Sequence, residues 1–279
     1  MKALSLLLIL ISQTAFATSD IKNEPANIHP GEVRVITFPA PDKSSVFSCK
    51  GEVLKWSFKN GMGSAIVIES YFSELHPFVC KLELNGKLAH QISFEVKPRD
   101  YKAEVLKVNP KTIKLAAKDE ERVWKEQKVL DRIYASSQTE FQFEAPFVQP
   151  MNSAITSVYG TKRVYNNQKK GQHLGIDYRA AIGQKVPATN AGIVMFAGDL
   201  FYTGWTVILD HGMDIFTVYG HLDKTLVTAG SKVKRSEIIG LSGNTGRTSG
   251  PHLHWGVKVH GQYIDGMSLI DETQKYFQK

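Results

Sequence analysis

Cysteine is almost absent from this sequence. The 279 residues include only Cys49 and Cys80, and neither the spacing nor the neighbours of this pair offers a cysteine-based zinc site. Any metal chemistry therefore has to depend on histidine and carboxylate side chains. An even pair of cysteines in an exported protein most simply forms one disulfide, which we expect here, with two buried free thiols as the alternative.

Long apolar runs are missing beyond the first residues. Residues 3–11 form a short apolar segment behind the positive Lys2, and the tripeptide AFA at 15–17 is a small-x-small cleavage site. This pattern predicts a signal peptide at residues 1–17. No cysteine near that site could carry a lipid anchor, and no later stretch reaches the roughly 18 apolar residues of a transmembrane helix. We therefore expect a soluble, exported protein, periplasmic or extracellular, without a transmembrane anchor.

Two common enzyme signatures are also absent. No HExxH occurs, so a glutamate general base of the usual metalloprotease kind is not evident. The glycine-rich segment SGNTGRTSG lacks the terminal Gly-Lys-Ser/Thr of a phosphate loop, and it leads into a strand instead of an anion-binding helix N-terminus. We interpret this segment as a flexible wall of a substrate groove.

Histidine and aspartate, in contrast, are concentrated in three short segments, QHLGID, VYGHL and GPHLHWGV. These segments supply five candidate groups: His173, Asp177, His221, His252 and His254. Catalytic zinc generally takes three nitrogen or carboxylate ligands and leaves one position for water, so five groups exceed the requirement by two. Together the segments contain what a mononuclear zinc hydrolase needs.

The segment PHLHWGV has the composition of a strand. Residues i and i+2 of a strand share a face, so His252 and His254 should project side by side. One of them could hold a metal while the other reaches its water. Any single histidine could equally be an ordinary surface or hydrogen-bonded residue, but that reading is poor for all of them together.

The remaining candidates occupy strand boundaries. His221 follows a strand-like run at residues 215–219, and we expect it at the strand's end, where a loop can aim it into a cleft. His173 and Asp177 have the spacing of a short loop entering a strand. Gly175 between them would allow an unusual backbone angle.

Together with the C-terminal VHGQYID, these segments resemble the lysostaphin and LytM family of zinc metallopeptidases, which cut peptidoglycan cross-links. The similarity runs from about residue 147 to residue 270, and its motifs are highly specific. It implies a sheet whose open groove runs past the zinc. It also implies His173, Asp177 and His254 as zinc ligands, and it places His221 and His252 beside the reacting water and carbonyl.

This resemblance favours an active enzyme. Many members of that family have lost one or more of the five residues and serve only as activators of other hydrolases, whereas this chain keeps them all. We expect a zinc endopeptidase that hydrolyses cross-links between peptidoglycan stem peptides, at the bond between D-alanine and a diamino acid. A non-catalytic wall-binding activator, a carboxypeptidase that trims terminal D-amino acids, and cleavage of glycine bridges are the alternatives.

Departures from the family pattern are few. Residues 247–249 stand where Thr-Gly before the proline is usual, and Gly266 occupies a position where proline is common. We expect neither departure to touch a ligand. His211 is typical of the family, but a structural or turn-stabilising role is expected for it.

The formal net charge of +7 makes the surface attractive to polyanions. Peptidoglycan and its associated acidic polymers suit that charge. Nucleic acid is the rival partner, but the lysines are scattered and no recognised nucleic-acid-binding fold is present. We expect no nucleic-acid partner, and we expect a monomer.

The chain is long enough for two domains after the signal peptide. Short alternating strands separated by turn signals predict a small β-sandwich, possibly immunoglobulin-like, at residues 18–98. The strands are expected at 32–38, 53–58, 65–68, 78–84 and 89–96. A linker follows at 99–146, and strands dominate the expected peptidase domain at 147–279. The predicted fold class is all-β.

One helix is expected in the linker. Residues 118–134 are charged, with apolar residues at near-helical spacing and acidic residues in the first turn. We expect this helix to pack between the two domains. Its alternative role is an inhibitory segment that covers the active cleft.

Overall fold

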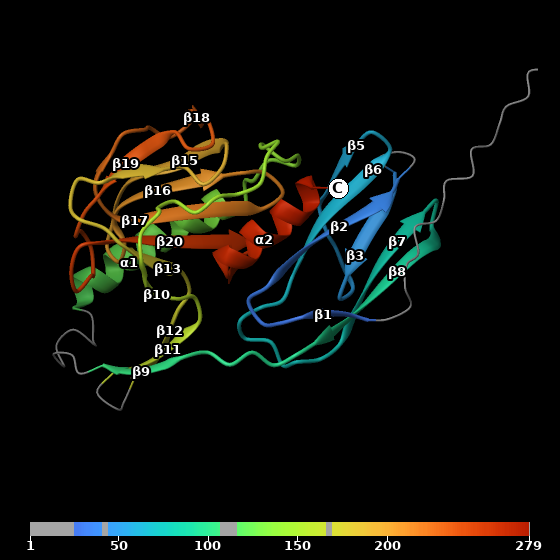
Figure 1. The fold of residues 1–279 in the computed structure, drawn as a ribbon, viewed down its shortest axis with the longest axis horizontal. Helices are drawn as coiled ribbons and strands as arrows, with labels where there is room; N and C mark the ends of the chain where they lie inside the picture. The colour runs from blue at the N-terminus through green and yellow to red at the C-terminus, as the bar shows by residue number, and fades with distance from the viewer. Residues whose placement is uncertain (1–24, 41–43, 107–115, 166–168, 279) are drawn as a thin grey trace, which may run out of the picture.

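The computed structural model describes residues 25–40, 44–106, 116–165 and 169–278. The expected signal peptide at residues 1–17 lies outside these described residues. Two β-rich regions lie beside each other, one of blue to green strands and one of yellow to red strands (Figure 1). Strands dominate both regions, so the expected fold class is confirmed.

The N-terminal region is a sandwich of two sheets. The larger sheet has the strand order β1-β8-β7-β3-β4, and the smaller has the order β2-β6-β5. The strands are β1 (Ala26–Ile28), β2 (Val33–Pro39), β3 (Val46–Cys49), β4 (Glu52–Val53), β5 (Trp56–Lys59), β6 (Met62–Ile68), β7 (Phe78–Leu84) and β8 (Lys87–Val96). The expected strand at 53–58 is divided between β4 and β5. The short β1 was not expected, because three residues carry too little alternation to be recognised.

The expected disulfide is confirmed. Cys49 on β3 and Cys80 on β7 lie directly opposite each other in the antiparallel register and are bonded. Both are buried in the apolar core between the two sheets, beside Phe47 and Phe94. The bond therefore fixes two neighbouring strands of the larger sheet and closes a loop of 31 residues.

The C-terminal region is built on a ten-stranded sheet whose main path is β10-β13-β20-β17-β16-β15-β18. β14 and β19 attach beside β17, and β21 pairs with β20. A separate three-stranded sheet has the order β12-β11-β9. The strands are β9 (Ala103–Leu106), β10 (Ile155–Ser157), β11 (Thr161–Tyr165), β12 (Lys169–His173), β13 (Ile176–Arg179), β14 (Lys185–Pro187), β15 (Gly192–Leu200), β16 (Gly204–Asp210), β17 (Ile215–Thr225), β18 (Lys232–Val233), β19 (Ile238–Ser242), β20 (His252–Val259) and β21 (Gln262–Ile264).

The expected helix is present as α1 (Ala117–Tyr134), but its expected position is wrong. Leu130 and Ile133 pack against Phe216 and Val218, on a face of the C-terminal sheet, and not between the two β regions. Figure 1 shows α1 on the side of that sheet away from the sandwich. The apolar stripe of the helix covers a sheet face that would otherwise remain exposed.

A second helix, α2 (Gly266–Phe277), joins the two regions. Ser268 Oγ accepts a hydrogen bond from the Val33 backbone, and Tyr276 OH lies 3.0 Å from Ser64 Oγ. Val33 also belongs to the same apolar cluster as the core of the C-terminal sheet. The sandwich is thus packed onto the helix at the end of the sheet. Among the described residues, no helix is both long and apolar enough to cross a membrane.

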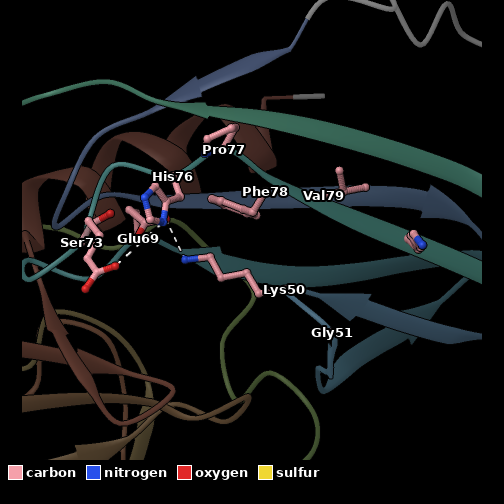
Figure 2. A pocket seen from close by; sticks show the side chains of 10 residues that line it. Lys50, Gly51, Glu69, Ser73, His76, Pro77, Phe78 and Val79 are labelled. Carbon is pink, nitrogen blue, oxygen red and sulfur yellow. Dashed lines mark hydrogen bonds and ion pairs between the residues drawn. The ribbon is translucent and has the colours of Figure 1, made fainter.

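A shallow hollow of about 610 Å³ lies on the sandwich (Figure 2). Lys50, Glu69, His76 and Phe78 contribute to its lining. Lys50 Nζ pairs with Glu69 Oε2 at 2.7 Å and lies over the Phe78 ring, so these two charged groups neutralise each other. The hollow shares no residue with the predicted histidine cluster.

Candidate metal centre

Strand register brings the predicted residues together. β13, β20 and β17 are neighbours in the ten-stranded sheet, and each pair is antiparallel. His254 on β20 lies opposite Asp177 on one side and opposite Gly220 on the other. Since His221 follows Gly220, candidates from three separate sequence segments meet in one row across the sheet.

Three of the side chains converge closely enough to hold one metal ion: His173, Asp177 and His254. His173 Nε2 lies 3.0 Å from Asp177 Oδ1 and 3.2 Å from His254 Nδ1. His254 Nδ1 lies 2.8 Å from the same Asp177 oxygen. Their side chains are between 7% and 18% exposed, so the cluster is largely removed from solvent.

The way in which His173 is held tests whether these donors suit a cation. Its Nδ1 lies 3.2 Å from the carbonyl oxygen of Val158, which can only accept, so Nδ1 carries a hydrogen and Nε2 points into the cluster. There Nε2 meets a carboxylate oxygen and a second ring nitrogen. This crowding requires either extra protons on the rings or a shared cation. Tetrahedral zinc ligands at about 2.0–2.2 Å would lie about 3.3 Å apart, close to the observed spacing.

Burial and charge act in opposite directions within the cluster. Burial alone would raise the pKa of the Asp177 carboxyl, but its contacts with His173 and His254 outweigh burial and hold that pKa well below its ordinary value. Burial lowers the pKa of His254, against the attraction of Asp177. The cluster therefore offers an ionised Asp177 carboxylate beside the His254 ring, which loses its proton readily.

His221 lies inside β17, and its expected position at a strand end is wrong. The register between β16 and β17 shifts here, so Gly220 and His221 together oppose the single residue Thr206. His221 has a φ of 59°, and its backbone N–H donates to the carbonyl of Thr203 at 2.6 Å. A β-bulge thus re-aims this side chain, which is the task expected of a loop.

The two remaining histidines are held alike. His221 Nδ1 donates to the carbonyl of Thr245 at 2.8 Å, and His252 Nδ1 donates to the carbonyl of Gly250 at 2.8 Å. Each ring therefore keeps a free Nε2 when neutral. The ring centroids are 4.7 Å apart, and His252 Nε2 is 3.6 Å from Asp177 Oδ1. Burial lowers the pKa of His221 to about 4, so it is a neutral base at pH 7.

Gly175 is required for a different reason from the one expected. It does not have a positive φ. A Cβ at this position would lie 2.4 Å from Cε1 of His254, so any side chain would displace that ring. The glycine allows close approach of the two segments, not an unusual backbone angle.

Several residues that position the site were not found from the sequence. The carbonyls of Thr203 and Thr245 orient His221, but a backbone carbonyl leaves no signal in residue identity. Ser157 Oγ lies 3.1 Å from His173 Nδ1, and Thr248 Oγ1 lies 3.1 Å from His252 Nδ1. Thr248 belongs to residues 247–249, which were expected not to touch a ligand, and its closeness in sequence to His252 was the available signal.

His211 has the structural role expected of it. It is fully buried, with Nδ1 2.7 Å from the carbonyl of Ala191 and Nε2 2.7 Å from Thr217 Oγ1. Burial lowers its pKa to about 4. The ring therefore joins the residue before β15 to β17 as a neutral hydrogen-bonding group.

Comparisons with known proteins place these segments in a family. The model of peptidase family M23 matches residues 171–266. The peptidoglycan DD-endopeptidase ShyA of Vibrio cholerae is 40% identical over 114 residues, which are 40% of this chain and 26% of that protein. The DD-carboxypeptidase/endopeptidase Mpg of Neisseria meningitidis is 36% identical over 106 residues, 38% of this chain and 24% of that protein. The chain thus spans about a quarter of the length of these curated relatives.

Solved structures give a comparison of the fold. A proposed M23 peptidase of Pseudomonas aeruginosa superposes with a TM-score of 0.69 over 90% of this chain and 96% of its own, at 23% identity, which shows a shared fold. The catalytic domain of lysostaphin from Staphylococcus simulans is 31% identical and covers 43% of this chain and 93% of that domain, with a TM-score of 0.39. The histidine and aspartate segments lie within residues 171–266, which the family model matches. Residues 171–266 therefore form a peptidase family M23 domain within this chain.

Proposed function

We propose that this chain is a zinc-dependent peptidoglycan endopeptidase in which His173, Asp177 and His254 hold the metal. The observation that carries the proposal is the triangle of donor atoms with edges of 2.8 to 3.2 Å, formed by two histidines and one carboxylate. Two nitrogens and one oxygen are a ligand set of the catalytic zinc type, which leaves a position for water. Membership of a metallopeptidase family supports the same reading.

The two further histidines are proposed to carry the proton transfers. Zinc, when bound, would supply Lewis-acid activation of water and of the scissile carbonyl. His221 and His252 each have Nδ1 fixed by a backbone carbonyl, so each presents Nε2 toward the cluster as an acceptor. One Nε2 can accept the proton of the attacking water and the other can stabilise charge on the carbonyl oxygen. Both rings are held by backbone groups, so their aim does not depend on a mobile side chain.

The proposed bond joins D-alanine to the side-chain amine of a diamino acid in a neighbouring stem peptide. Relatives named as DD-endopeptidases support this substrate class. The Neisseria relative is named as both a DD-carboxypeptidase and an endopeptidase, so trimming of terminal D-alanine is the second candidate activity. Cleavage of glycine bridges is the remaining alternative.

Location and organisation follow from the substrate. We propose an exported, monomeric protein at the cell wall, with residues 1–17 as its signal peptide. The sandwich at 18–98 is proposed to position the peptidase domain at 147–279 on the wall, with 99–146 as the linker. The formal net charge of +7 supports attraction to acidic wall polymers.

Digestion of purified peptidoglycan tests the proposal. Directly cross-linked and glycine-bridged sacculi are incubated with the full chain, with and without a zinc chelator, and the muropeptides are separated. We expect dimers of the directly cross-linked wall to become monomers with intact stem ends. Loss of only the terminal D-alanine would favour the carboxypeptidase, and release of glycine peptides would redirect the substrate. Unchanged muropeptides with zinc-loaded protein would favour the non-catalytic activator.

A further inference from the structure

The carboxylate of Asp177 faces two different environments. Its Oδ1 contacts His173 Nε2 and His254 Nδ1. Its Oδ2 faces away from these rings and lies 3.8 Å from Nη2 of Arg163. The charge of the guanidinium therefore acts on the carboxylate oxygen that is not part of the donor triangle.

Arg163 also reaches a second member of the cluster through a hydroxyl. Its Nη2 donates to Ser157 Oγ at 3.1 Å, and Ser157 Oγ lies 3.1 Å from His173 Nδ1. The hydroxyl oxygen can accept from both groups at once. One guanidinium thus contacts the supports of two candidate ligands, Asp177 directly and His173 through Ser157.

Arg163 is also contacted by the linker. β9 pairs in parallel with β11, and Glu104 lies opposite Arg163 in that register. Glu104 Oε2 is 3.9 Å from Arg163 Nε, a buried donor with no hydrogen-bond partner among the described residues. Glu104 on β9 therefore contacts Nε of the guanidinium, whereas Asp177 and Ser157 contact Nη2.

We propose that Arg163 is a positioning residue of the metal centre, and that Glu104 on the linker strand orients it. This inference rests on the proposed function. The guanidinium holds Asp177 Oδ2, which keeps Oδ1 aimed at the donor triangle, and it fixes the ring of His173 through Ser157. Both effects restrict the ligand side chains before a cation binds. The ligands then lose less conformational freedom on binding, so metal affinity is higher.

This assignment extends the metal centre beyond the segment of the chain that the family model matches. Ser157 and Arg163 precede residues 171–266, which the family model matches, and Glu104 lies still further upstream. A fragment that begins at residue 147 would retain Arg163 but lose Glu104. The linker strand is then a structural part of the zinc site and not only a connection.

The test is zinc affinity of the full chain, measured by competition with a chromophoric chelator. Arg163→Met removes the charge and the donors, Arg163→Lys keeps the charge, and Glu104→Gln removes the orienting charge. Lys162→Met is the matched control, because Lys162 is the exposed neighbour on β11 and loses the same unit of charge. The visible spectrum of the cobalt-substituted protein reports ligand geometry, and the melting temperature of the metal-free protein reports folding.

We expect Arg163→Met to raise the zinc Kd by about 10- to 100-fold, the usual effect of removing a residue that supports metal ligands. Arg163→Lys should restore part of the affinity, Glu104→Gln should weaken binding several-fold, and Lys162→Met should match the wild type. The cobalt spectrum should change in Arg163→Met and not in the control. Metal-free melting temperatures should stay close together.

Three results would overturn the inference: an unchanged Kd in folded Arg163→Met, equal weakening in Lys162→Met, or no rescue by Arg163→Lys. Should Arg163→Met not fold, unchanged affinity in both Arg163→Lys and Glu104→Gln would overturn it. Binding is measured without substrate, so a wild type that binds zinc but cuts no wall rejects the proposed function alone. A wild type that binds no zinc rejects both.

Discussion

The two β-rich regions bury different kinds of side chain. The sandwich encloses aliphatic and aromatic residues and a disulfide, and its buried Glu69 is neutralised by Lys50. The C-terminal sheet encloses a comparable apolar core, but it also buries His173 and Asp177 in contact with each other, and His221 against His252. Burial of polar groups is unfavourable unless each is paired. The comparison indicates that the sandwich is arranged for stability, whereas one row of the sheet gives up stability for a preformed donor set.

The strongest test of this comparison removes the donor set. Asp177→Ala and His254→Ala should lose bound zinc and hydrolysis together, because two remaining ligands hold zinc poorly. His76→Ala, a change of an exposed histidine on the sandwich, should keep both. Metal analysis after dialysis and muropeptide release provide the measurements. Full zinc content in both sheet variants would reject the ligand assignment.

A second change separates chemistry from metal retention within the sheet. His221→Ala and His252→Ala should keep zinc near the wild-type level, since neither ring is part of the donor triangle. Turnover should fall by about 100-fold or more, the scale of losing a positioned base or oxyanion donor. Zinc content and kcat are measured on the same preparations. A variant that loses its zinc would reveal a ligand, and one with ordinary kcat would reveal a bystander.

The disulfide offers the converse test in the sandwich. Replacing Cys49 and Cys80 with serine should reduce the free energy of unfolding by roughly 2 to 4 kcal/mol, because the unfolded chain gains loop freedom. Denaturant unfolding followed by Trp fluorescence measures this loss. Zinc affinity should remain that of the wild type. A fall in zinc affinity together with stability would show that the metal cluster depends on the stability of the sandwich.

The smallest expected effect concerns pH and the buried His211. Its pKa is lowered from 6.5 to about 4, so the unfolded state binds more protons between these values. The stability that the neutral ring contributes is complete above pH 6.5 and is lost as the pH falls through about 4. The loss amounts to roughly 2 to 3 kcal/mol.

His211→Gln keeps a neutral hydrogen-bonding side chain and provides the comparison. Both proteins are unfolded in denaturant without metal, from pH 7 to pH 4. Protonation of the metal cluster then affects both proteins equally and cancels in the difference between their unfolding free energies. The stability advantage of the wild type should shrink over this range. A constant difference between the two proteins would show that His211 does not titrate on unfolding.

Much of the fold could be predicted because its signals are local. Alternation identified β6, β7 and β8, and the apolar spacing of residues 118–134 identified α1. The packing of α1 could not be predicted, because the face that it covers is formed by strands far along the chain. The helix stripe shows that a partner exists but not which surface supplies it.

The candidate site shows the same limit. The five residues were identified from motifs, and the pairing of His252 with His254 followed from strand periodicity. The bulge at His221 depends on the register with β16, and the contact of Gly175 with His254 depends on the packing of two segments. Arg163 was not singled out either, because its distance to Asp177 depends on how the three-stranded sheet that contains β11 is placed relative to β13. The sequence motifs therefore identify the residues that carry the chemistry. The contacts that support those residues depend on strand register and packing, which the sequence alone does not show.

The pairing of Asp177 with His254 also has a consequence for biogenesis. The two residues are separated by 77 positions, and their strands become neighbours only when β20 inserts between β13 and β17. The donor set therefore cannot exist until residue 254 has been synthesised and its strand has joined the sheet. The proposed exported hydrolase would therefore stay inactive while its chain is still emerging. Zinc content of chains truncated before residue 252 provides the check, and stoichiometric metal in such chains would contradict this order of events.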